Sequence, residues 1–429
     1  LTYPGAFISE MLRLAILLIA ACAAHGATYE RERAQVSKGV SGSCDVDARL
    51  DLSGKSPPVI LVEENGEWNL AAPTTRTKYN SYLSLANKKI MLTCPGERNS
   101  LSIGSVSAYA TCKSSNGINY FVVNGKEYKT DSIRCSARAQ PYEYNTKQSC
   151  NGDGTLLKLG YMVNNKIADV ITTCHRIADG MTYWSRHILD GSGLPQRGNG
   201  GKRPDEEGRP QFTFRNKDLF RGFPPYRYYK QDNELNALAQ AIGSSEARQI
   251  FNEREDKFFS KGHLSPNADF LLETTRDVTF LFVNVQPQWQ EVNGGNWNEV
   301  EVANRYNAAA TGKKYEVITG APGNLAPKSK NVFLDYSNQR IPVPSTYTKL
   351  IREVESNKCV ALVSTNFPES QVKPKCKDIC SAYNWPALKD AKKAGYVYCC
   401  SYDEFAKAFP KSAPKVDCSG GVLTNMNRG

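Results

Sequence analysis

Residues 284–305 read NVQPQWQEVNGGNWNEVEVANR, and this stretch carries the most informative spacing in the chain. Four residues of different chemical kinds follow one another at intervals of four: Asn293, Trp297, Glu301 and Arg305. On a helix this spacing places their side chains along one slowly drifting face. An amide, a ring, a carboxylate and a guanidinium do not make a core stripe. An exposed helix with an i,i+4 ion pair would explain only the last two residues. We therefore expect a functional helix behind the Asn-Gly-Gly turn.

The preceding block, FFSKGHLSPNAD at 258–269, holds one of only four histidines in the chain. His263 follows a lysine and a glycine, and a proline and an aspartate come soon after it. A single histidine beside a glycine is structural or solvated in most proteins, so this block alone does not establish chemistry. Its interpretation depends on the helix that follows it in the sequence.

Composition indicates a folded protein with acidic partners. The chain has 429 residues, of which 40% are hydrophobic and 10% aromatic, so it can form real cores and is long enough for two domains. This excludes an intrinsically disordered protein. The formal net charge of +11 favours nucleic acid, anionic glycans or a membrane surface as partners, but does not choose among them.

The N-terminal region has the organisation of a secretory signal. Residues 1–10 precede the first methionine, Met11, and the sequence continues as MLRLAILLIAACAAHGATY. One arginine precedes an apolar run of about eleven residues, and small residues follow around Ala24. The run is too short to span a bilayer, and no later segment is apolar enough for a membrane anchor. We predict a signal peptide within 1–26 that starts at Met11, and hence a secreted protein; a buried N-terminal helix is the alternative.

Cysteine usage supports an oxidising compartment. Of the 13 cysteines, Cys22 lies in the predicted signal and twelve remain. Six of these fall within residues 44–174 and six within 359–418, with none between. This distribution predicts two disulfide-stapled regions and no free thiol. A zinc site is the competing interpretation for the C-terminal cysteines, although the adjacent Cys399 and Cys400 suit tetrahedral ligation poorly.

Two regions differ in their predicted structure. Residues 27–145 contain short apolar runs joined by Asn-Gly, as in VILVEENGEWNL and YFVVNGKEYK, which predicts β-hairpins in a small accessory domain without catalytic residues. In residues 146–429, strands and helices alternate irregularly, which favours an α+β fold over a doubly wound sheet. Helical spacing occurs in 233–255 and 296–314, and the stretch 277–288, DVTFLFVNVQPQ, has the composition of a buried strand.

Several ordered blocks of the sequence together resemble one family. SKGHLSPNADF is followed by NVQPQWQEVNGGNWNEVE, and then by YEVITGAPG and IPVPSTYTKLI. In this order they are similar to the DNA/RNA non-specific endonucleases of the ββα-metal type, and most of all to the secreted arthropod members. The resemblance covers roughly residues 150–410 and is weak over the accessory region. It implies an α+β nuclease domain over 146–429, with a mixed or antiparallel sheet and a cysteine-rich tail, after the small β-rich, disulfide-braced domain.

The resemblance also implies a general base and a metal ligand. The family's catalytic histidine falls on His263 and its magnesium-binding asparagine on Asn293. A neutral imidazole can take a proton from water near neutral pH. Mg2+ keeps several waters and takes few protein ligands, so one carboxamide can serve as the sole direct ligand, with Mn2+ as a substitute.

Four further residues complete the implied site. Glu301 would hold metal-bound water, and Lys261 and Arg305 would contact phosphates. Asn284 matches the asparagine of the family's following strand. The family's Asp-Arg-Gly-His is Ser-Lys-Gly-His here, so Ser260 replaces the acid, and the lysine offers charge without the bidentate geometry of arginine.

These expectations describe a secreted, Mg2+-dependent endonuclease that hydrolyses phosphodiester bonds of DNA, with duplex DNA favoured and RNA as a further candidate substrate. Nucleic acid is the expected partner, and neither a membrane nor an obligate protein partner is inferred. The alternative is a secreted nucleic-acid-binding protein on a catalytically decayed nuclease scaffold, which the altered acid position favours and the intact His263, Asn293 and Glu301 oppose. A polyanion-binding matrix or salivary protein is a third hypothesis, supported by net charge alone.

Two other features have ordinary explanations as well as functional ones. The basic aromatic run FRGFPPYRYYK at 220–230 could follow a nucleic-acid backbone, or could be a surface loop. For His175 and His187 we expect packing or surface roles.

Overall fold

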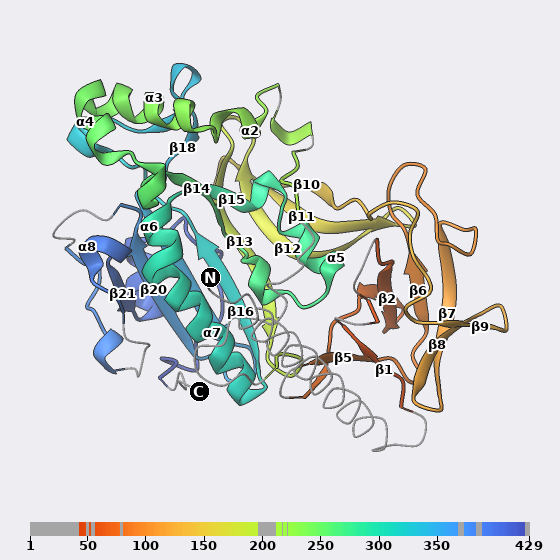
Figure 1. Cartoon of the computed structure of the whole chain (residues 1–429). Helices are drawn as coiled ribbons and strands as arrows, with labels where there is room; N and C mark the ends of the chain where they lie inside the picture. The colour runs from red at the N-terminus through yellow and green to blue at the C-terminus, as the bar shows by residue number, and fades with distance from the viewer. Residues whose placement is uncertain are drawn as a thin grey trace, which may run out of the picture.

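The computed structural model describes residues 43–48, 51–52, 56–77, 80–195, 212–216, 218–220, 222–367, 373–382 and 388–424. Its centre is a sheet of eight strands in the order β10-β11-β12-β13-β16-β19-β20-β21 (Figure 1), and every neighbouring pair is antiparallel. The strands are β10 (Tyr142–Cys150), β11 (Gly154–Val163), β12 (Lys166–Arg176), β13 (Met181–Asp190), β16 (Lys314–Gly320), β19 (Thr346–Glu353), β20 (Cys359–Thr365) and β21 (Val397–Cys400). The predicted α+β class is confirmed.

A helix covers each side of the central sheet. Successive residues of a strand point to opposite faces, so neighbours in the sequence enter different cores. In β16, Val317 packs with α7 (Asn298–Thr311), whereas the next residue, Ile318, packs with Phe405 of α9 (Tyr402–Ala408). Because both faces are buried, the central strands are apolar at consecutive positions.

The ββα arrangement that the resemblance implied is present. Strand β14 (Phe259–His263) pairs antiparallel with β15 (Val285–Trp289), and the chain then passes through α6 (Gln290–Val292) and a π-helical turn (Asn293–Trp297) into α7. The hairpin therefore brings the His263 block beside the block that contains Asn293, although they are separated in the sequence.

The expectation of a single helical face from Asn293 to Arg305 is wrong. Gly295 has non-helical dihedral angles (φ −94°, ψ −126°), and α7 begins only at Asn298. Trp297 does not share an exposed stripe, because it is fully buried and its ring lies 5.7 Å from that of Tyr347. Only the Glu301 and Arg305 part of the predicted stripe lies on one regular helix.

The buried strand expected at 277–288 is only half a strand. Its first residues end α5 (Glu273–Val278) and form a 3-10 turn (Phe282–Asn284), and β15 starts at Val285. Burial was predicted correctly, but an apolar run does not distinguish a strand from a buried turn. The helix expected at 233–255 is divided into two helices at Gly243, where φ is 98°.

Shorter elements complete the nuclease region. They are α2 (Pro225–Tyr228), α3 (Gln231–Ile242), α4 (Ser244–Ile250), α8 (Ala391–Ala394), β17 (Phe333–Asp335) and β18 (Arg340–Pro342). Strands β17 and β18 pair with each other in a separate two-stranded sheet.

The accessory region is β-rich, as predicted. It contains a six-stranded sheet of β3 (Glu67–Leu70), β2 (Val59–Glu64), β6 (Ile90–Thr93), β7 (Ser107–Ser115), β8 (Ile118–Val123) and β9 (Lys126–Lys129), and a three-stranded sheet of β1 (Asp45–Asp47), β5 (Ser81–Ser84) and β4 (Thr75–Arg76). In the first Asn-Gly turn φ is 55° at Asn65 and 81° at Gly66, and in the second it is 50° at Asn124 and 76° at Gly125. Positive φ at both positions is what a type I′ hairpin turn requires.

All twelve cysteines outside the predicted signal form disulfides, so the zinc hypothesis is wrong. The pairs are Cys44–Cys112, Cys94–Cys135, Cys150–Cys174, Cys359–Cys418, Cys376–Cys400 and Cys380–Cys399. No pair joins the first six cysteines to the last six, which agrees with two separately stapled regions.

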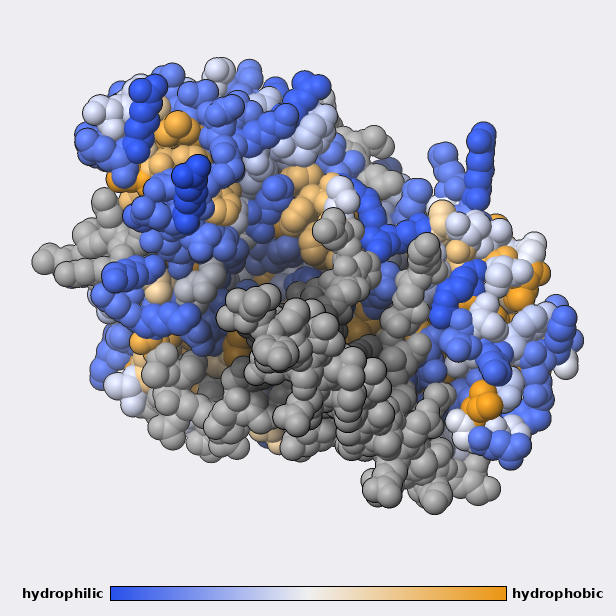
Figure 2. Space-filling view, viewed as in Figure 1, coloured by the Kyte–Doolittle hydropathy of each residue, from blue (hydrophilic) through white to orange (hydrophobic). Residues whose placement is uncertain are grey.

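The predicted signal peptide, with Cys22 and His25, lies outside the described residues. None of the described helices is long and apolar enough to cross a membrane. On the face seen in Figure 2, the described surface is mostly hydrophilic, and its apolar patches are small and separate.

The accessory region and the central sheet share their cores. Val59 and Leu61 of β2 and Met91 of β6 pack in the same buried cluster as Leu157 of β11. In the other direction, Leu272 comes from the connection between β14 and β15 and packs, 4% exposed, in the core of the accessory region. The segment between the two strands of the ββα hairpin therefore completes the accessory core.

Leu272→Ala should destabilise the protein by about 2–5 kcal/mol, because deletion of a buried leucine side chain leaves a cavity in a packed core. Urea unfolding followed by tryptophan fluorescence measures the change. Ile118→Ala, at a side chain 36% exposed on β8, is the control. A loss below about 1 kcal/mol for Leu272→Ala would mean that this leucine is not part of a packed core.

Candidate active site

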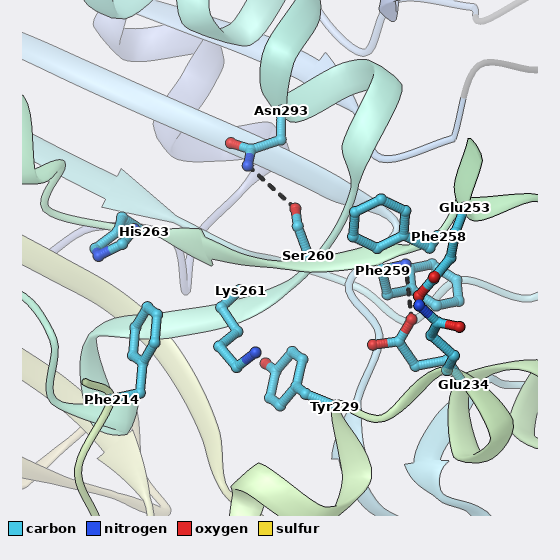
Figure 3. Close-up of a pocket in the computed structure, with 11 residues that line it drawn as sticks. Phe214, Tyr229, Glu234, Glu253, Phe258, Phe259, Ser260, Lys261, His263 and Asn293 are labelled. Atoms are coloured by element: carbon cyan, nitrogen blue, oxygen red, sulfur yellow. Dashed lines mark hydrogen bonds between the residues drawn. The ribbon is translucent and has the colours of Figure 1, made fainter. Parts of the chain in front are cut away.

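A pocket of about 380 Å³ lies beside the β14–β15 hairpin (Figure 3). It brings together three of the six predicted site residues: Lys261 and His263 on β14, and Asn293 in the π-helical turn. The rest of its lining is Phe214, Tyr229, Gln231, Glu234, Glu253, Phe258, Phe259 and Ser260. The other three predicted residues, Asn284, Glu301 and Arg305, do not line this pocket.

His263 is the last residue of β14 and has an uncommitted ring nitrogen. Its ring centroid lies 5.3 Å from that of Phe214 and 5.0 Å from that of Phe280. Its Nε2 is buried and has no hydrogen-bond partner among the described residues. Burial lowers the pKa of this imidazole to about 4, so the ring is neutral at neutral pH. It is therefore in the state in which a histidine can accept a proton.

The side chains of Ser260 and Asn293 form a hydrogen bond that sets the direction of the carboxamide. The Ser260 hydroxyl donates its single proton to the carbonyl oxygen of Gln288 at 2.9 Å, since that carbonyl can only accept. Ser260 Oγ must therefore accept from Asn293 Nδ2, which lies 3.1 Å away. Asn293 Oδ1 points away from Ser260 (Figure 3), and within the part of the chain that the structure describes no hydrogen bond engages it.

Close packing explains the glycine of the Gly-His motif. A Cβ on Gly262 would lie 2.5 Å from Cβ of Gln288 and 2.8 Å from Oη of Tyr347, which is closer than side-chain atoms approach one another. The absence of a side chain lets the fully buried Gln288 lie directly against β14. The same residue supplies the carbonyl that holds Ser260.

Asn284 holds the chain that follows His263. Its Nδ2 donates to the carbonyls of Ser265 and Thr279, both at 3.0 Å, and its Oδ1 accepts from the Ser265 N–H at 3.0 Å. The side chain is 0% exposed. Both amide protons are thus used within the fold, and Asn284 is placed to position His263 rather than to contact a substrate.

Lys261 is held between two aromatic rings in the pocket wall. Its Nζ lies 5.6 Å from the ring centroid of Phe214 and 5.1 Å from that of Tyr229, within cation–π range. Glu234 of α3 accepts a hydrogen bond from the Phe259 N–H at 3.1 Å, and its second oxygen points toward Lys261 and Tyr229 (Figure 3). Burial raises the pKa of Glu234 to about 8 and lowers that of Lys261, whereas their mutual attraction opposes both shifts.

Glu301 and Arg305 belong to a second group of charges, on the α7 side of the hairpin. Arg305 Nη1 lies 2.9 Å from Asp269 Oδ1, and Asp269 Oδ2 lies 2.9 Å from His187 Nε2. His187 Nδ1 lies 3.0 Å from Ser265 Oγ, which links this group to the loop after His263. Burial would raise the pKa of Asp269, but the hydrogen bond from His187 and the charge of Arg305 hold it well below its usual range.

Burial also raises the pKa of Glu301, to about 7, against the opposing charges of Lys349 and Arg305. Lys349 is 1% exposed, donates to Thr319 Oγ1 at 2.7 Å and lies 5.1 Å from the ring centroid of Trp297. Burial lowers the pKa of Lys349, while Glu301 and Asp269 act in the opposite direction. Glu301 can therefore gain or lose a proton near neutral pH.

Four buried polar residues of these two groups were not predicted as site residues: Asp269, Lys349, Glu234 and His187. For the first three, a feature of the sequence could have indicated a buried polar role. Asp269 lies inside the SKGHLSPNADF block, and Lys349 directly precedes the aliphatic pair Leu350 and Ile351. A charge among buried residues requires a buried partner. Glu234 lies at helical spacing from the buried alanines and leucine of α3, which places it on the apolar face. His187 has no comparable feature in the sequence; of the packing or surface roles expected for it, the structure shows the buried one, since it is 2% exposed.

The basic aromatic run at 220–230 is not a single surface loop. Phe220 and Phe223 are buried in the core, Tyr226 is 50% exposed, and Tyr229 lines the pocket. His175 is fully buried with Nδ1 2.8 Å from Thr182 Oγ1, as a packing role requires.

The β14 strand ends in a neutral histidine with an unpaired ring nitrogen and pairs with β15, and a π-helical turn that presents the Asn293 oxygen leads from there into α7. This arrangement defines the class of metal-dependent ββα nucleases. The sequence model of the DNA/RNA non-specific endonuclease family matches residues 153–405, which is more than half of the chain. The chain belongs to this family, and the prediction of a nuclease is confirmed at the level of the class of enzyme.

Curated relatives extend the similarity into the accessory region. The chain is 26% identical over 384 residues to a salivary endonuclease of Lutzomyia longipalpis, with 87% of this chain and 85% of the relative covered. It is 27% identical over 387 residues to salivary protein Tsal2A of Glossina morsitans morsitans, with 88% and 93% covered. For salivary protein Tsal1 of the same organism the identity is 22% over 391 residues, with 87% and 92% covered.

Asp269→Ala should destabilise the protein by about 3–5 kcal/mol at neutral pH, because it leaves Arg305 and His187 without their buried partner. The pKa of Asp269 is depressed in the folded state, so its contribution is present above about pH 4 and lost as the pH falls further. Chemical unfolding at neutral and at low pH measures both effects. The exposed Asp131→Ala is the control, with a change within about 0.5 kcal/mol. Equal effects of the two substitutions would contradict a buried charge network.

Proposed function

We propose that this protein is a secreted, Mg2+-dependent endonuclease that hydrolyses phosphodiester bonds of DNA, with duplex DNA preferred and His263 as general base. Members of its family act on nucleic acid and depend on a divalent metal; Mg2+ and duplex DNA are the specific part of the proposal. The observation that carries it is the state of His263: Nε2 is buried without a described partner, on a ring that burial keeps neutral. This nitrogen is in the same pocket as the oriented carboxamide of Asn293.

The donor set around Asn293 fits a hard divalent cation. Mg2+ prefers oxygen ligands and keeps several of its waters. Ser260 turns the amide oxygen of Asn293 outward, and Glu301, in the first turn of α7, would accept hydrogen bonds from metal-bound water. When bound, the metal supplies positive charge to the phosphoryl oxygens and the leaving oxygen. The cluster Asp378, Cys380 and Cys399 does not compete for it, because its two cysteines form a disulfide.

Residues of the chain itself provide the general base, the positioning contacts and the remaining positive charge. His263 accepts a proton from the attacking water as the new bond to phosphorus forms and the bond between phosphorus and the leaving oxygen breaks. Asn284 fixes the backbone after His263, and Gly262 lets the strand lie close to β15. Arg305, held by Asp269, and Lys261, held between two rings, supply positive charge for the phosphates. Asn284 is in this proposal a positioning residue.

We further propose that residues 27–145 form an accessory domain before a nuclease domain at 146–429, and that a signal peptide within 1–26 exports the protein. The relatives are salivary proteins by name, which supports an extracellular setting. The proposal includes neither a membrane nor an obligate protein partner.

His263→Ala should reduce cleavage of plasmid DNA by at least about 10²–10⁴-fold, the usual cost of a lost general base, while binding of DNA and of Mg2+ persists. Asn293→Ala should shift the metal concentration for half-maximal rate upward, with partial recovery at high Mg2+ or in Mn2+. The measurement is cleavage rate against metal concentration, with melting temperature as a check on folding.

Asn293→Asp is the matched control for the metal ligand. It keeps an oxygen in place but cannot donate to Ser260, so it should depend less strongly on added metal than Asn293→Ala. If the wild type shows no metal-dependent cleavage, or if His263→Ala cleaves at the wild-type rate, the catalytic assignment fails. A nucleic-acid-binding protein on a decayed scaffold would then be the better description.

The pH dependence should separate the roles of His263 and Glu301. Activity needs a neutral His263 and an ionised Glu301, and burial sets their pKa values to about 4 and about 7. Cleavage at saturating Mg2+ should therefore fall as the pH drops through about 7. In Glu301→Gln the residual rate should fall only as the pH drops through about 4. A wild-type profile that stays flat down to pH 5 would remove Glu301 from the mechanism.

A further inference from the structure

Two phenylalanines and an arginine form a column that leads away from His263. The His263 ring lies 5.0 Å from Phe280, Phe280 stacks 4.9 Å from Phe212, and the guanidinium carbon of Arg138 lies 4.9 Å from the Phe212 ring. Three such steps place Arg138 within about 15 Å of His263, a span of about four base-pair steps along a duplex.

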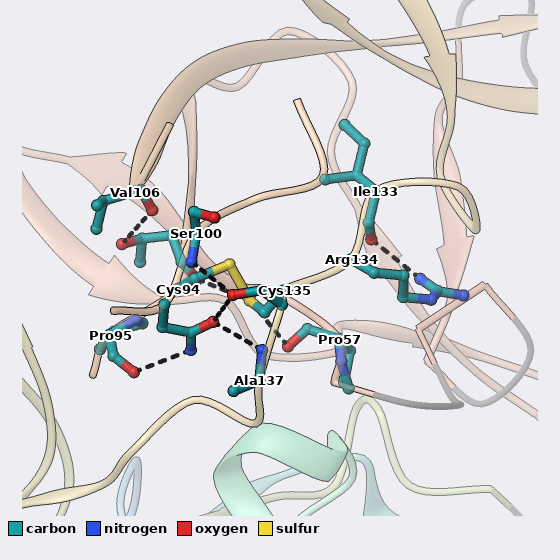
Figure 4. The surroundings of a disulfide bond; sticks show 12 residues. Pro57, Cys94, Pro95, Ser100, Val106, Ile133, Arg134, Cys135 and Ala137 are labelled. Atoms are coloured by element: carbon teal, nitrogen blue, oxygen red, sulfur yellow. Dashed lines mark hydrogen bonds between the residues drawn. A yellow bond between two sulfur atoms is a disulfide. The ribbon is translucent and has the colours of Figure 1, made fainter. Parts of the chain in front are cut away.

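Arg138 comes from the accessory region and is presented on a rigid support. It lies between β9 and β10, shortly after Cys135, whose disulfide to Cys94 fastens this segment (Figure 4). The Ala137 N–H donates to Asn99 Oδ1 at 2.9 Å, in the same group of hydrogen bonds. Because the backbone is already fixed, a ligand bound by Arg138 would not have to order it.

Among the described residues, those around Arg138 include more basic than acidic groups. Four arginines interact there with two carboxylates: Arg134, Arg138, Arg215 and Arg276 with Glu273 and Asp277. Arg215 binds Asp277 through both of its terminal nitrogens, at 3.0 and 3.1 Å, whereas Arg138 meets Glu273 in a single contact at 3.5 Å. The side chain of Arg138 is 31% exposed and that of Glu273 only 11%. The more accessible charge of this pair is therefore the cation.

We propose that Arg138, supported by Phe212, is a subsite for a backbone phosphate of the nucleic acid, so that the accessory region takes part in substrate binding. This inference rests on the proposed function, because it takes the scissile phosphate to lie at His263. A guanidinium held over a ring keeps its N–H groups available for phosphate oxygens. A strand that passes His263 carries further phosphates within the span that separates His263 from Arg138.

A structural clamp would behave differently from a phosphate subsite. If Arg138 only fastened the accessory region to α5 through Glu273, loss of either partner would have the same effect. If Arg138 binds phosphate, its removal weakens binding, whereas removal of the Glu273 charge leaves the cation more available. The two substitutions therefore have opposite expected effects on nucleic-acid affinity.

The test is binding of a short fluorescent DNA duplex by the full chain in EDTA, which prevents metal-dependent cleavage, across a series of salt concentrations. For Arg138→Ala the dissociation constant should rise several-fold at low salt, and the slope of log K against log salt should become shallower by about 1. For Glu273→Gln the slope of log K against log salt should equal that of the wild type, and the affinity for the duplex should be equal to or higher than the wild-type affinity. Lys126→Ala, at an exposed lysine on β9, should change neither.

An unchanged slope in Arg138→Ala overturns the subsite. So does an equal loss of affinity in Arg138→Ala and Glu273→Gln, accompanied by an equal fall in melting temperature, since that is the behaviour of a clamp. In both cases Mg2+-dependent cleavage by the wild type would leave the proposed function intact. If the wild type neither cleaves with Mg2+ nor binds duplex in a salt-dependent manner, the proposed function and the subsite both fail.

Discussion

The register between β14 and β15 is the constraint on which the site depends. Ser260 lies opposite Gln288 and His263 opposite Val285, and a slip of one residue would turn every side chain of β14 to the other face of the hairpin. Gly262 prevents such a slip. No other residue of β14 lacks a side chain, so only this register leaves room for the buried Gln288. The direction of the Asn293 carboxamide and the position of the His263 ring both follow from it.

Elements with a strong local signal could be predicted from the sequence, and those shaped by distant contacts could not. The Asn-Gly hairpins and α7 follow from turn chemistry and helical spacing, which lie within a few residues of each other. The interruption of the helix at Gly295 does not follow from neighbouring residues in the sequence. A Cβ there would lie 2.7 Å from the carbonyl oxygen of Ala394, so α8, far along the chain, decides how the backbone passes this point. The prediction of one continuous helix from the spacing by four was therefore wrong at Gly295, where the backbone contacts a helix that is distant in the sequence.

The candidate site shows the same division. His263 and Asn293 could be assigned from motif blocks, and the fold places both in one pocket. The surroundings of Arg305 and Glu301 could not be predicted, because they are assembled from other elements: Arg305 pairs with Asp269, which His187 of β13 also binds, and Lys349 of β19 lies near Glu301. A sequence shows that a charge is present, but not that another charge neutralises it. Asn284 was predicted as a site residue, and its hydrogen bonds show it as a support for the chain after His263.

The position of Leu272 has a consequence for the order in which the chain can fold. Both disulfides of the accessory region, Cys44–Cys112 and Cys94–Cys135, join residues that leave the ribosome well before Leu272. They can form early, but the core around them lacks one apolar side chain until the segment between β14 and β15 has been synthesised. The accessory region is therefore completed in the same step that closes the catalytic hairpin. A nascent chain that stopped between these points would have paired cysteines and an unfilled core, and would expose apolar surface that chaperones can recognise.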